Sequence, residues 1–258
     1  RLGEDHFWSS LRRQRRRPRA LRLGEDHFWS SLRRQRRRPS RASVNPNTMF
    51  HVKPEPEPPI AAELFGDSID KARAFTANLV AQGEELGLIG PLELPRIWTR
   101  HILNSVLVAP LLRPGRVGDV GSGAGLPGLV LAMARPDVEF VLIEPMERRV
   151  DWLDSQVREL ALDNVEVVRA RAQEVEFSPW LDQVTARAVS ALSKLIPMTA
   201  RLVRSGGELL LMKGASVDAE LRAASKAVAR ARLSDVEILV LGEGIVDEVT
   251  RVFRATVD

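Results

Sequence analysis

Residues 116–128 read RVGDVGSGAGLPG, an apolar run that breaks into glycines and leads into a helical stretch ending near Ala134. This order predicts a β-strand, a tight turn and the start of a helix. The glycines allow positive φ angles and a close approach of the backbone to a ligand, while the first helical turn offers unpaired N–H donors. The segment therefore predicts a site for a nucleoside cofactor.

Two glycine patterns overlap in this turn and predict different cofactors. Asp-x-Gly-x-Gly-x-Gly over 119–125 is typical of S-adenosylmethionine enzymes, whereas Gly-x-Gly-x-x-Gly over 123–128 fits the dinucleotide fingerprint. Both folds need an acid for the ribose hydroxyls after the second strand, and Glu144 follows the apolar run at 138–143. We expect Gly123 to lack space for a β-branched side chain. The turn alone leaves the cofactor open.

The rest of the chain distinguishes the two patterns. Strands are predicted at 117–120, 139–143, 165–168, 183–188 and 208–212, alternating with helices that end at 134, 160, 202 and 231. This alternation predicts a doubly wound α/β sheet. Two β-rich runs at 236–241 and 249–257 then predict a hairpin. A terminal hairpin puts one antiparallel strand into a seven-stranded, Rossmann-like sheet, the architecture of class I S-adenosylmethionine-dependent methyltransferases.

Three segments precede this methyltransferase domain at 114–258. Apolar residues recur at helical spacing within 60–113, which predicts an N-terminal helical cap. Residues 49–59 are rich in proline and are predicted to be a linker. Residues 1–48 form an extension that we expect to be disordered or not native, with translation starting at Met49.

A repeat dominates the extension. RLGEDHFWSSLRRQRRRP at 1–18 recurs letter for letter at 22–39. Residues 1–48 hold 14 basic and 4 acidic side chains, a charge of +10, whereas the remainder holds 24 and 30, a charge of −6. The formal charge of +4 therefore does not argue for nucleic-acid binding by the folded domain. An RNA-binding tail is the alternative interpretation of the extension.

The composition excludes several kinds of site. There is no cysteine, and the four histidines lack the spacing of a zinc motif, so no metal site is predicted. No apolar run reaches about 18 residues, and no signal peptide with an apolar core is present. We expect a soluble, cytoplasmic monomer with no membrane partner.

Five motifs occur in the order found in one known family: RHILNS at 100–105, DVGSGAGLPG at 119–128, RAQE at 171–174, ARA at 186–188 and MKG at 212–214. By these motifs the chain, from about residue 60 to its end, resembles the bacterial small-subunit (16S) ribosomal RNA guanine-N7 methyltransferase G family, also called glucose-inhibited division protein B. The extension at 1–48 lies outside the resemblance.

The resemblance implies methyl transfer from S-adenosyl-L-methionine to N7 of guanine 527 in 16S rRNA, a 7-methylguanosine modification of rRNA processing. Its partner is 16S rRNA or the small ribosomal subunit. Guanine N7 is an unprotonated lone pair, so this reaction needs no general base. It needs the nucleophile, methyl group and sulfonium to be aligned.

We expect the cofactor to be held by the turn and by the ends of the following strands, namely by Asp119, Gly121, Gly123, Gly125, Leu126, Glu144, Ala172, Gln173 and Arg187. The glycines line the methionine and ribose side, with the leucine packing alongside. Asp119 anchors the turn or the amino group of the cofactor, and Glu144 accepts hydrogen bonds from the ribose. The resemblance places adenine at Ala172 and Gln173.

Arg187 is the predicted catalytic residue, because it ends the fourth strand, where ligands bind in parallel sheets. It would orient guanine or a phosphate, and a salt bridge to Asp182 is its alternative role. His101 and Lys213 are candidates for rRNA contact, with a structural histidine and a solvated strand end as alternatives. Other arginines near the strand ends are interpreted as solvated charges, with phosphate recognition near the crevice as the alternative: Arg148, Arg149, Arg169 and Arg171.

Three other functions fit parts of the sequence. A methyltransferase acting on another RNA, a protein or a small molecule would share the fold and the cofactor. A dinucleotide-dependent oxidoreductase is disfavoured by the terminal hairpin and by the absence of tyrosine for a proton relay. A non-catalytic RNA-binding protein would act through the basic repeats.

Overall fold

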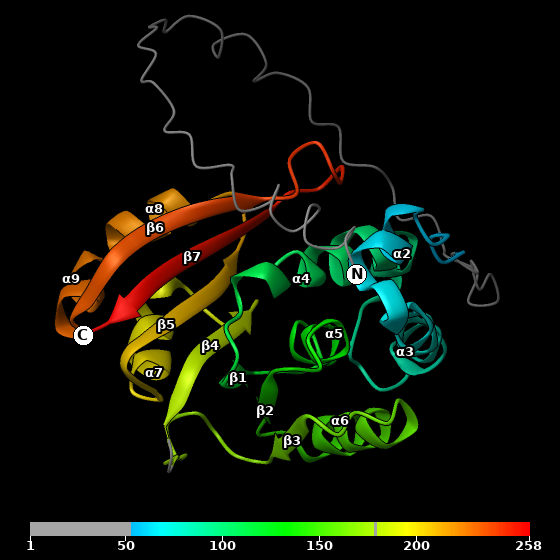
Figure 1. Ribbon diagram of the computed structural model, residues 1–258, viewed down its shortest axis with the longest axis horizontal. Helices are drawn as coiled ribbons and strands as arrows, with labels where there is room; N and C mark the ends of the chain where they lie inside the picture. The colour runs from blue at the N-terminus through cyan, green and yellow to red at the C-terminus, as the bar shows by residue number, and fades with distance from the viewer. Residues whose placement is uncertain (1–52, 178–179) are drawn as a thin grey trace, which may run out of the picture. The chain divides into compact units, whose positions relative to one another are not determined.

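The centre of the fold is a seven-stranded sheet with the order β3-β2-β1-β4-β5-β7-β6 (Figure 1). Its strands are β1 Arg116–Val120, β2 Glu139–Ile143, β3 Val165–Val168, β4 Leu181–Arg187, β5 Val203–Lys213, β6 Leu233–Leu241 and β7 Thr250–Val257. Neighbouring strands pair in parallel except β7, which runs antiparallel to β5 and β6. The predicted sheet, with one antiparallel strand from a terminal hairpin, is confirmed.

The computed structural model describes residues 53–177 and 180–258, which belong to one compact unit. The repeat-bearing extension and the expected start at Met49 lie outside the described residues. Within the described ranges, no helix is both long enough and apolar enough to cross a membrane.

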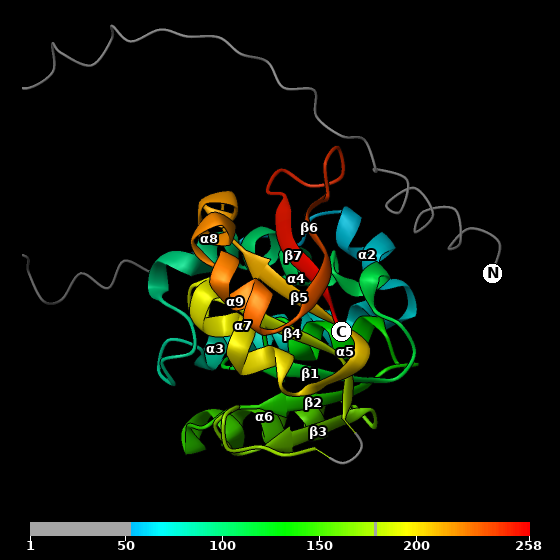
Figure 2. The same ribbon diagram turned by 90° about the vertical axis from the view of Figure 1, so that its left-hand side faces the viewer.

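Helices cover both faces of the sheet. They are α2 Ile60–Phe65, α3 Ile69–Gln82, α4 Asn104–Val106, α5 Gly128–Ala134, α6 Glu147–Glu159, α7 Leu192–Ala200, α8 Val217–Ala223 and α9 Ser225–Arg230. The strand order reverses at β1, so right-handed crossovers place α5 and α6 on one face and α7 to α9 on the other. Figure 2 shows α7, α8 and α9 side by side, and the cap helices α2 to α4 pack on α5.

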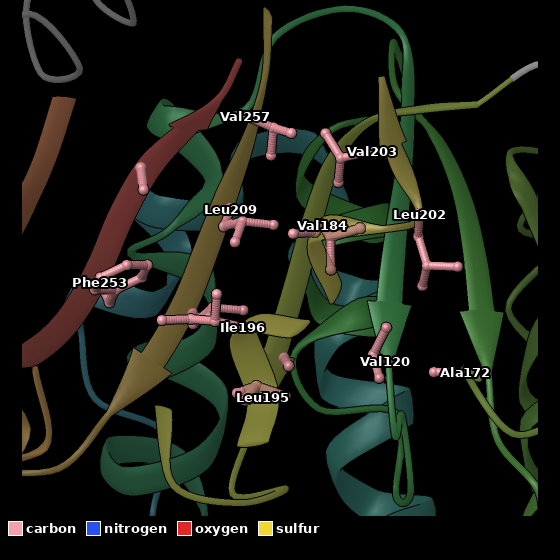
Figure 3. Close-up of a cluster of buried hydrophobic side chains, with 14 of the residues drawn as sticks. Val120, Ala172, Val184, Leu195, Ile196, Leu202, Val203, Leu209, Phe253 and Val257 are labelled. Atoms are coloured by element: carbon pink, nitrogen blue, oxygen red, sulfur yellow. The ribbon is translucent and has the colours of Figure 1, made fainter. Parts of the chain in front are cut away.

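The core between the sheet and α7 is made of aliphatic and aromatic side chains (Figure 3). Val184 of β4, Leu209 of β5 and Phe253 of β7 are fully buried, together with Leu195 and Ile196 of α7. Each such side chain contributes about 1.5–3 kcal/mol relative to its exposed state. Because both faces of the sheet are covered, β2 (EFVLI) and the second half of β5 (ELLLM) read as nearly continuous apolar runs, whereas β1 and β4 also carry the buried polar residues Asp119, Gln183 and Thr185.

From residue 91 to 111, the cap predicted within 60–113 consists of short helical turns instead of a continuous helix. They are 3₁₀ helices at Pro91–Arg96 and Ala109–Leu111, a π-helix at Ile97–Leu103, and α4. Pro95 and Pro110 lack the N–H group that a continuous α-helix would use, which explains the interruptions. The irregular cap brings Glu93 and His101 close together, as described below.

The described part of the Pro-rich segment lies against the cap. The Glu55 N–H donates to the Leu94 carbonyl at 3.0 Å, and the Glu55 carboxylate accepts from the Thr99 N–H at 2.9 Å. Glu57 pairs with Arg73 at 2.7 Å. The described part of the expected linker is therefore fastened to the cap by its acidic residues.

Two other boundaries differ from expectation. The helix predicted at 219–231 is divided into α8 and α9 at Ala224, whose ψ of 4° departs from helical geometry. β5 begins at Val203 rather than at 208, because a bulge in its pairing with β4 accommodates Gly206 and Gly207.

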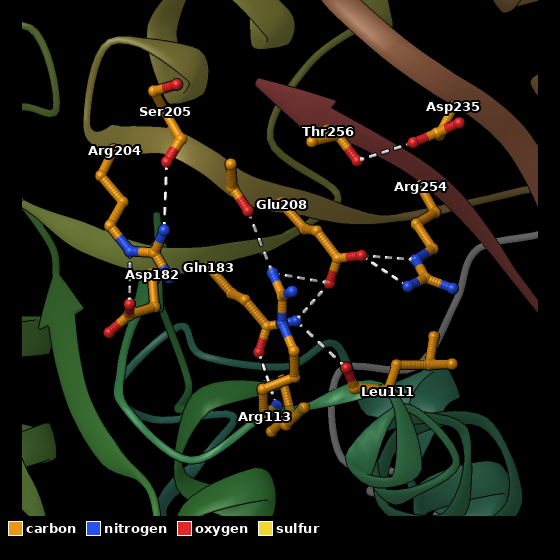
Figure 4. A network of polar contacts seen from close by, with 12 residues as sticks. Leu111, Arg113, Asp182, Gln183, Arg204, Ser205, Glu208, Asp235, Arg254 and Thr256 are labelled. Carbon is orange, nitrogen blue, oxygen red and sulfur yellow. Dashed lines mark hydrogen bonds and ion pairs between the residues drawn. The ribbon is translucent and has the colours of Figure 1, made fainter. Parts of the chain in front are cut away.

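A polar network joins β4, β5 and β7 (Figure 4). Glu208, which is 5% exposed, accepts hydrogen bonds from Arg254 at 2.5 Å and from the Gln183 amide at 2.8 Å. Asp182 pairs with Arg204 at 2.7 Å. These acids are thus engaged by cations of the sheet itself.

Candidate active site

Asp119 fixes the turn between β1 and α5. Its buried carboxylate accepts a hydrogen bond from the Gly128 N–H at 3.0 Å through Oδ2 and one from the Thr185 hydroxyl at 3.2 Å through Oδ1. Burial raises the pKa of Asp119 to about 6, although these hydrogen bonds favour the ionised form. Asp119 therefore joins β1 to β4 and to the first turn of α5. These contacts correspond to anchoring of the turn, one of the two roles predicted for Asp119.

Three glycines of the turn have positive φ, but the space around them differs. A Cβ at Gly121 (φ +72°) would meet Val189 Cγ2 at 2.9 Å, and one at Gly125 (φ +92°) would meet Leu129 Cδ1 at 2.4 Å. At Gly123 (φ +54°) no atom lies closer than 3.7 Å. The expected lack of space at Gly123 is therefore wrong, and backbone strain alone restricts that position.

Glu144 follows β2 and is 2% exposed. Its Oε2 accepts from the Gly123 N–H and its Oε1 from the Met146 N–H, both at 3.0 Å. Each carboxylate oxygen has a second lone pair, so both oxygens can still accept a hydroxyl hydrogen. The backbone thus fixes the orientation of Glu144.

A cavity of about 370 Å³ lies outside the carboxyl ends of β1, β2 and β4, where an open sheet binds ligands at the reversal of strand order. Five of the predicted cofactor residues line it: Gly121, Glu144, Ala172, Gln173 and Arg187. Four others do not line it but build and brace the turn: Asp119, Gly123, Gly125 and Leu126. Of the three glycines expected along the cofactor, Gly121 lies on the cavity wall, and contact of the cofactor with the other two stays a prediction.

Like Arg171, Arg149 of α6 lines the same cavity, which favours the alternative role in ligand recognition over its interpretation as a solvated charge. Its Nε is buried and has no hydrogen-bond partner among the described residues. Its Nη1 lies 3.9 Å from Glu144 Oε2. An unpaired buried donor costs about 1–3 kcal/mol, which makes Nε a candidate donor to a ligand. Arg169, by contrast, pairs with Glu147 at the surface.

Arg187 is held by the cap and not by Asp182. Its Nη2 donates to His101 Nδ1 at 2.8 Å, and its Nη1 donates to the Arg100 carbonyl at 3.2 Å. Burial lowers the pKa of Arg187 to about 10, partly offset by the charge of Asp119. The side chain therefore remains a cation at neutral pH and lies on the cavity wall.

His101 lies behind Arg187 and is not among the residues that line the cavity. Its Nε2 is 2.8 Å from Glu93 Oε2, and its side chain is 11% exposed. Burial, and then the charge of Arg187, lower the pKa of His101 to about 4. The position fits the structural alternative for His101 better than direct contact with rRNA.

The ammonium group of Lys213, at the end of β5, is also engaged within the protein. Its Nζ donates to the Ser190 carbonyl at 2.8 Å and pairs with Glu220 at 2.7 Å, and the side chain is 9% exposed. Glu220 also accepts from the Leu192 N–H at 3.2 Å. Lys213 is therefore not a solvated strand end. A phosphate contact would need an accessible ammonium group, and the ammonium group of Lys213 is largely buried and already paired.

Several residues at or behind the cavity, Glu93 and Val189 among them, were given no role at the level of sequence. Glu93 lies in a Pro-rich turn that matches no motif, and Val189 only follows one. Arg149 had a usable signal, because it lies in the first turns of the helix that follows the ribose acid. Proximity to such a helix start favours a ligand-facing side chain.

The comparisons with known proteins come from sequence and from structure. Residues 68–248 match the GidB family, described as rRNA small subunit methyltransferase G. The chain is 68% identical over 203 residues to the Ribosomal RNA small subunit methyltransferase G of Leifsonia xyli subsp. xyli, covering 79% of this chain and 97% of that protein. It is 69% identical to the protein of the same name from Clavibacter michiganensis subsp. michiganensis, covering 79% and 96%. A solved SAM dependent methyltransferase from Aquifex aeolicus aligns with a TM-score of 0.49 at 19% identity, covering 67% of this chain and 98% of that one.

Proposed function

Because this chain belongs to the rRNA small subunit methyltransferase G family, we propose that it methylates N7 of guanine 527 in the 16S rRNA of the small ribosomal subunit. Methylation of ribosomal RNA is the activity of the family. The base and the atom are our proposal. The observation that carries methylation of rRNA is the 68% identity across 97% of a relative that bears this name, and the choice of base and atom rests on the motif resemblance described above.

S-adenosyl-L-methionine, the cofactor predicted from the sequence, is the methyl donor of this family. When bound, it supplies an electrophilic methyl group on a sulfonium. The cavity fits such a molecule in three respects. Gly121 presents bare backbone to the cavity at a point where a Cβ would clash with Val189, Glu144 keeps lone pairs for ribose hydroxyls, and Arg149 Nε is a buried donor in need of an acceptor.

The cavity also suits a nucleophile that carries no proton. Glu144 is the only carboxylate among the residues that line it, and two backbone N–H groups hold its oxygens. The other ionisable residues on its wall are Arg149, Arg171 and Arg187, which cannot act as bases at neutral pH. An attack by guanine N7 needs alignment and no base, in agreement with this lining.

Arg187 is proposed to hold the guanine or an adjacent phosphate. A guanidinium pairs with phosphate through two parallel hydrogen bonds, and a single N–H of it can donate to guanine O6 while the N7 lone pair stays free for the methyl group. The base becomes positively charged during the reaction, so the phosphates of the RNA would have to offset the charge of Arg187. The cationic wall favours a polyanionic substrate.

The test is a mapped methylation reaction. Small subunits that lack the modification, and free 16S rRNA, are incubated with the protein and the cofactor carrying a labelled methyl group, and the labelled base is located by chemical cleavage at 7-methylguanosine. We expect label at guanine 527 and none in subunits that already carry the modification. Label at another base, in another RNA or in ribosomal protein would overturn the assignment in favour of a different methyltransferase.

A further inference from the structure

A chain of three side chains runs from the cap to the end of β4. Glu93 lies in the 3₁₀ helix Pro91–Arg96, His101 in the π-helix Ile97–Leu103, and Arg187 at the end of β4. The two links, Glu93 Oε2 to His101 Nε2 and His101 Nδ1 to Arg187 Nη2, are both 2.8 Å long. Three separate elements therefore meet in one line of hydrogen bonds.

The chemistry of the groups fixes the protons in this line. A guanidinium can only donate, so Nδ1 of His101 must accept and carries no proton. The ring then has its proton on Nε2 and donates it to the carboxylate of Glu93. Protonation of Nδ1 would place an N–H donor of His101 against an N–H donor of Arg187, and an imidazolium against a guanidinium. The histidine is thus a neutral connector with one defined tautomer.

The charged groups around His101 favour the same state. Arg187 faces Nδ1 from β4, and Glu93 faces Nε2 from the 3₁₀ helix. Arg100, whose Nε lies 3.2 Å from Glu93 Oε2, adds a second cation from the π-helix. While His101 is neutral, the cluster contains one carboxylate, on Glu93, and two guanidinium groups, on Arg100 and Arg187. Burial makes a third positive charge, on the His101 ring, unfavourable.

We propose that Glu93 and His101 are positioning residues that set the plane of the Arg187 guanidinium for the substrate base. This inference rests on the proposed function, because it assumes that Arg187 holds the guanine. Two of the terminal N–H groups of Arg187 are used on the cap side, by His101 and by the Arg100 carbonyl. Its remaining N–H groups are thereby aimed by the cap. A π-helix at this point is consistent with a functional constraint.

The experiment tests the two hydrogen bonds of the His101 ring, at Nδ1 and at Nε2, separately. Asn places its side-chain oxygen near the position of Nδ1 and can still accept from Arg187, whereas Gln reaches the position of Nε2 and can only replace the link to Glu93. We expect His101→Gln to lower kcat for small-subunit methylation about 10- to 100-fold, the cost of a misplaced reactive group, and His101→Asn, which keeps an acceptor for Arg187 and loses only the link to Glu93, to lower it by about tenfold. Binding of S-adenosylhomocysteine should change less than about threefold in both.

A matched pair of carboxylates controls for stability. Glu93→Met removes the acceptor at the end of the line, and Glu57→Met removes a cap carboxylate that pairs with Arg73, away from Arg187. We expect Glu93→Met to lower kcat by about tenfold with an unchanged KM, and Glu57→Met to leave kcat within about twofold. Thermal unfolding of each variant shows whether a loss of rate follows a loss of folded protein.

A spectroscopic measurement is independent of turnover. Nitrogen-15 NMR of the histidine rings, with His101 assigned by its absence in His101→Gln, should give an unprotonated Nδ1 and a protonated Nε2 at neutral pH. A protonated Nδ1, or normal kcat in both His101→Gln and Glu93→Met, would overturn the positioning role. If the wild-type protein transfers no methyl group to rRNA, the proposed function fails instead, while the NMR result still decides whether the hydrogen-bond line exists.

Discussion

On the β1–β2 side of the cavity, ligand-facing geometry is set by backbone groups at the ends of two adjacent strands, whereas on the β4 side it is set by side chains of the cap. Gly121 donates to the Ile143 carbonyl at the end of β2, and Glu144 accepts from the N–H groups of Gly123 and Met146. Arg187 is oriented by His101, 86 residues away, and through it by Glu93. The comparison suggests that the first side is built for an invariant cofactor and the second for a large substrate recognised jointly by sheet and cap.

The largest effect should follow from removing the cation on the β4 side. We expect Arg187→Ala to lower kcat/KM for small subunits by about 2–4 kcal/mol, the size of a lost, partly desolvated charged contact. Arg187→Lys should recover only part, because it keeps the charge and loses the planar fork. Steady-state kinetics check this, with Arg204→Ala, which breaks the pair with Asp182 at the other end of β4, as control. Normal turnover in Arg187→Ala would mean that another residue holds the base.

The β1–β2 side should respond to crowding of the turn. Gly121→Val combines a positive φ with a displaced Val189, and we expect it to weaken S-adenosylhomocysteine binding by about 2–3 kcal/mol. Gly123→Val meets only the backbone strain, so about 1 kcal/mol is expected. Calorimetric titrations of the two variants measure the difference. Equal losses would show that the space beside Val189 does not matter.

The buried histidine of the β4 side should make stability depend on pH. The pKa of His101 is lowered from 6.5 to about 4, so in this range the unfolded chain binds a proton that the folded chain does not. The contribution of neutral His101 to the free energy of unfolding is complete above about pH 6.5 and is lost as the pH falls towards 4. We expect about 2 kcal/mol of lost unfolding free energy between pH 7 and pH 5.

Urea unfolding of the wild type and of His101→Gln checks this dependence, and the variant should lack that part of the slope. The comparison between the two proteins is needed because Asp119, with its raised pKa, acts in the opposite direction: its contribution is present at low pH and is lost as the pH rises through about 6. Identical slopes for the two proteins would contradict the neutral, buried state of His101.

The smallest effect is expected at Arg149. Arg149→Met removes the buried Nε donor and should weaken S-adenosylhomocysteine binding by about 1 kcal/mol, the usual size of one hydrogen bond. Arg169→Met, which breaks only a surface ion pair with Glu147, is the matched control and should leave affinity unchanged. Tighter binding in Arg149→Met would mean that Nε receives no ligand atom.

The same contrast explains what the sequence could and could not predict. The glycine turn, Glu144 and the terminal hairpin are local patterns, so the sheet, Gly121 and Glu144 could be predicted from them. Arg187 followed from its place at a strand end, and Ala172 and Gln173 only from the family resemblance. Glu93, by contrast, acts only through the irregular turns around Pro95, and no periodicity encodes those turns. The burial of Lys213 depends on Glu220 in α8, a tertiary pairing without a sequence signal. Gly123 was misjudged because a glycine pattern indicates φ but not the space around a Cβ.

The most direct test of the separation between the two sides is a calorimetric titration of S-adenosylhomocysteine into Arg187→Ala beside the wild type. If the β1–β2 side holds the cofactor and Arg187 serves the base, the two dissociation constants should agree within about threefold, a difference below 1 kcal/mol. Loss of binding in Arg187→Ala, with the variant folded, would place Arg187 in the cofactor subsite and contradict the account.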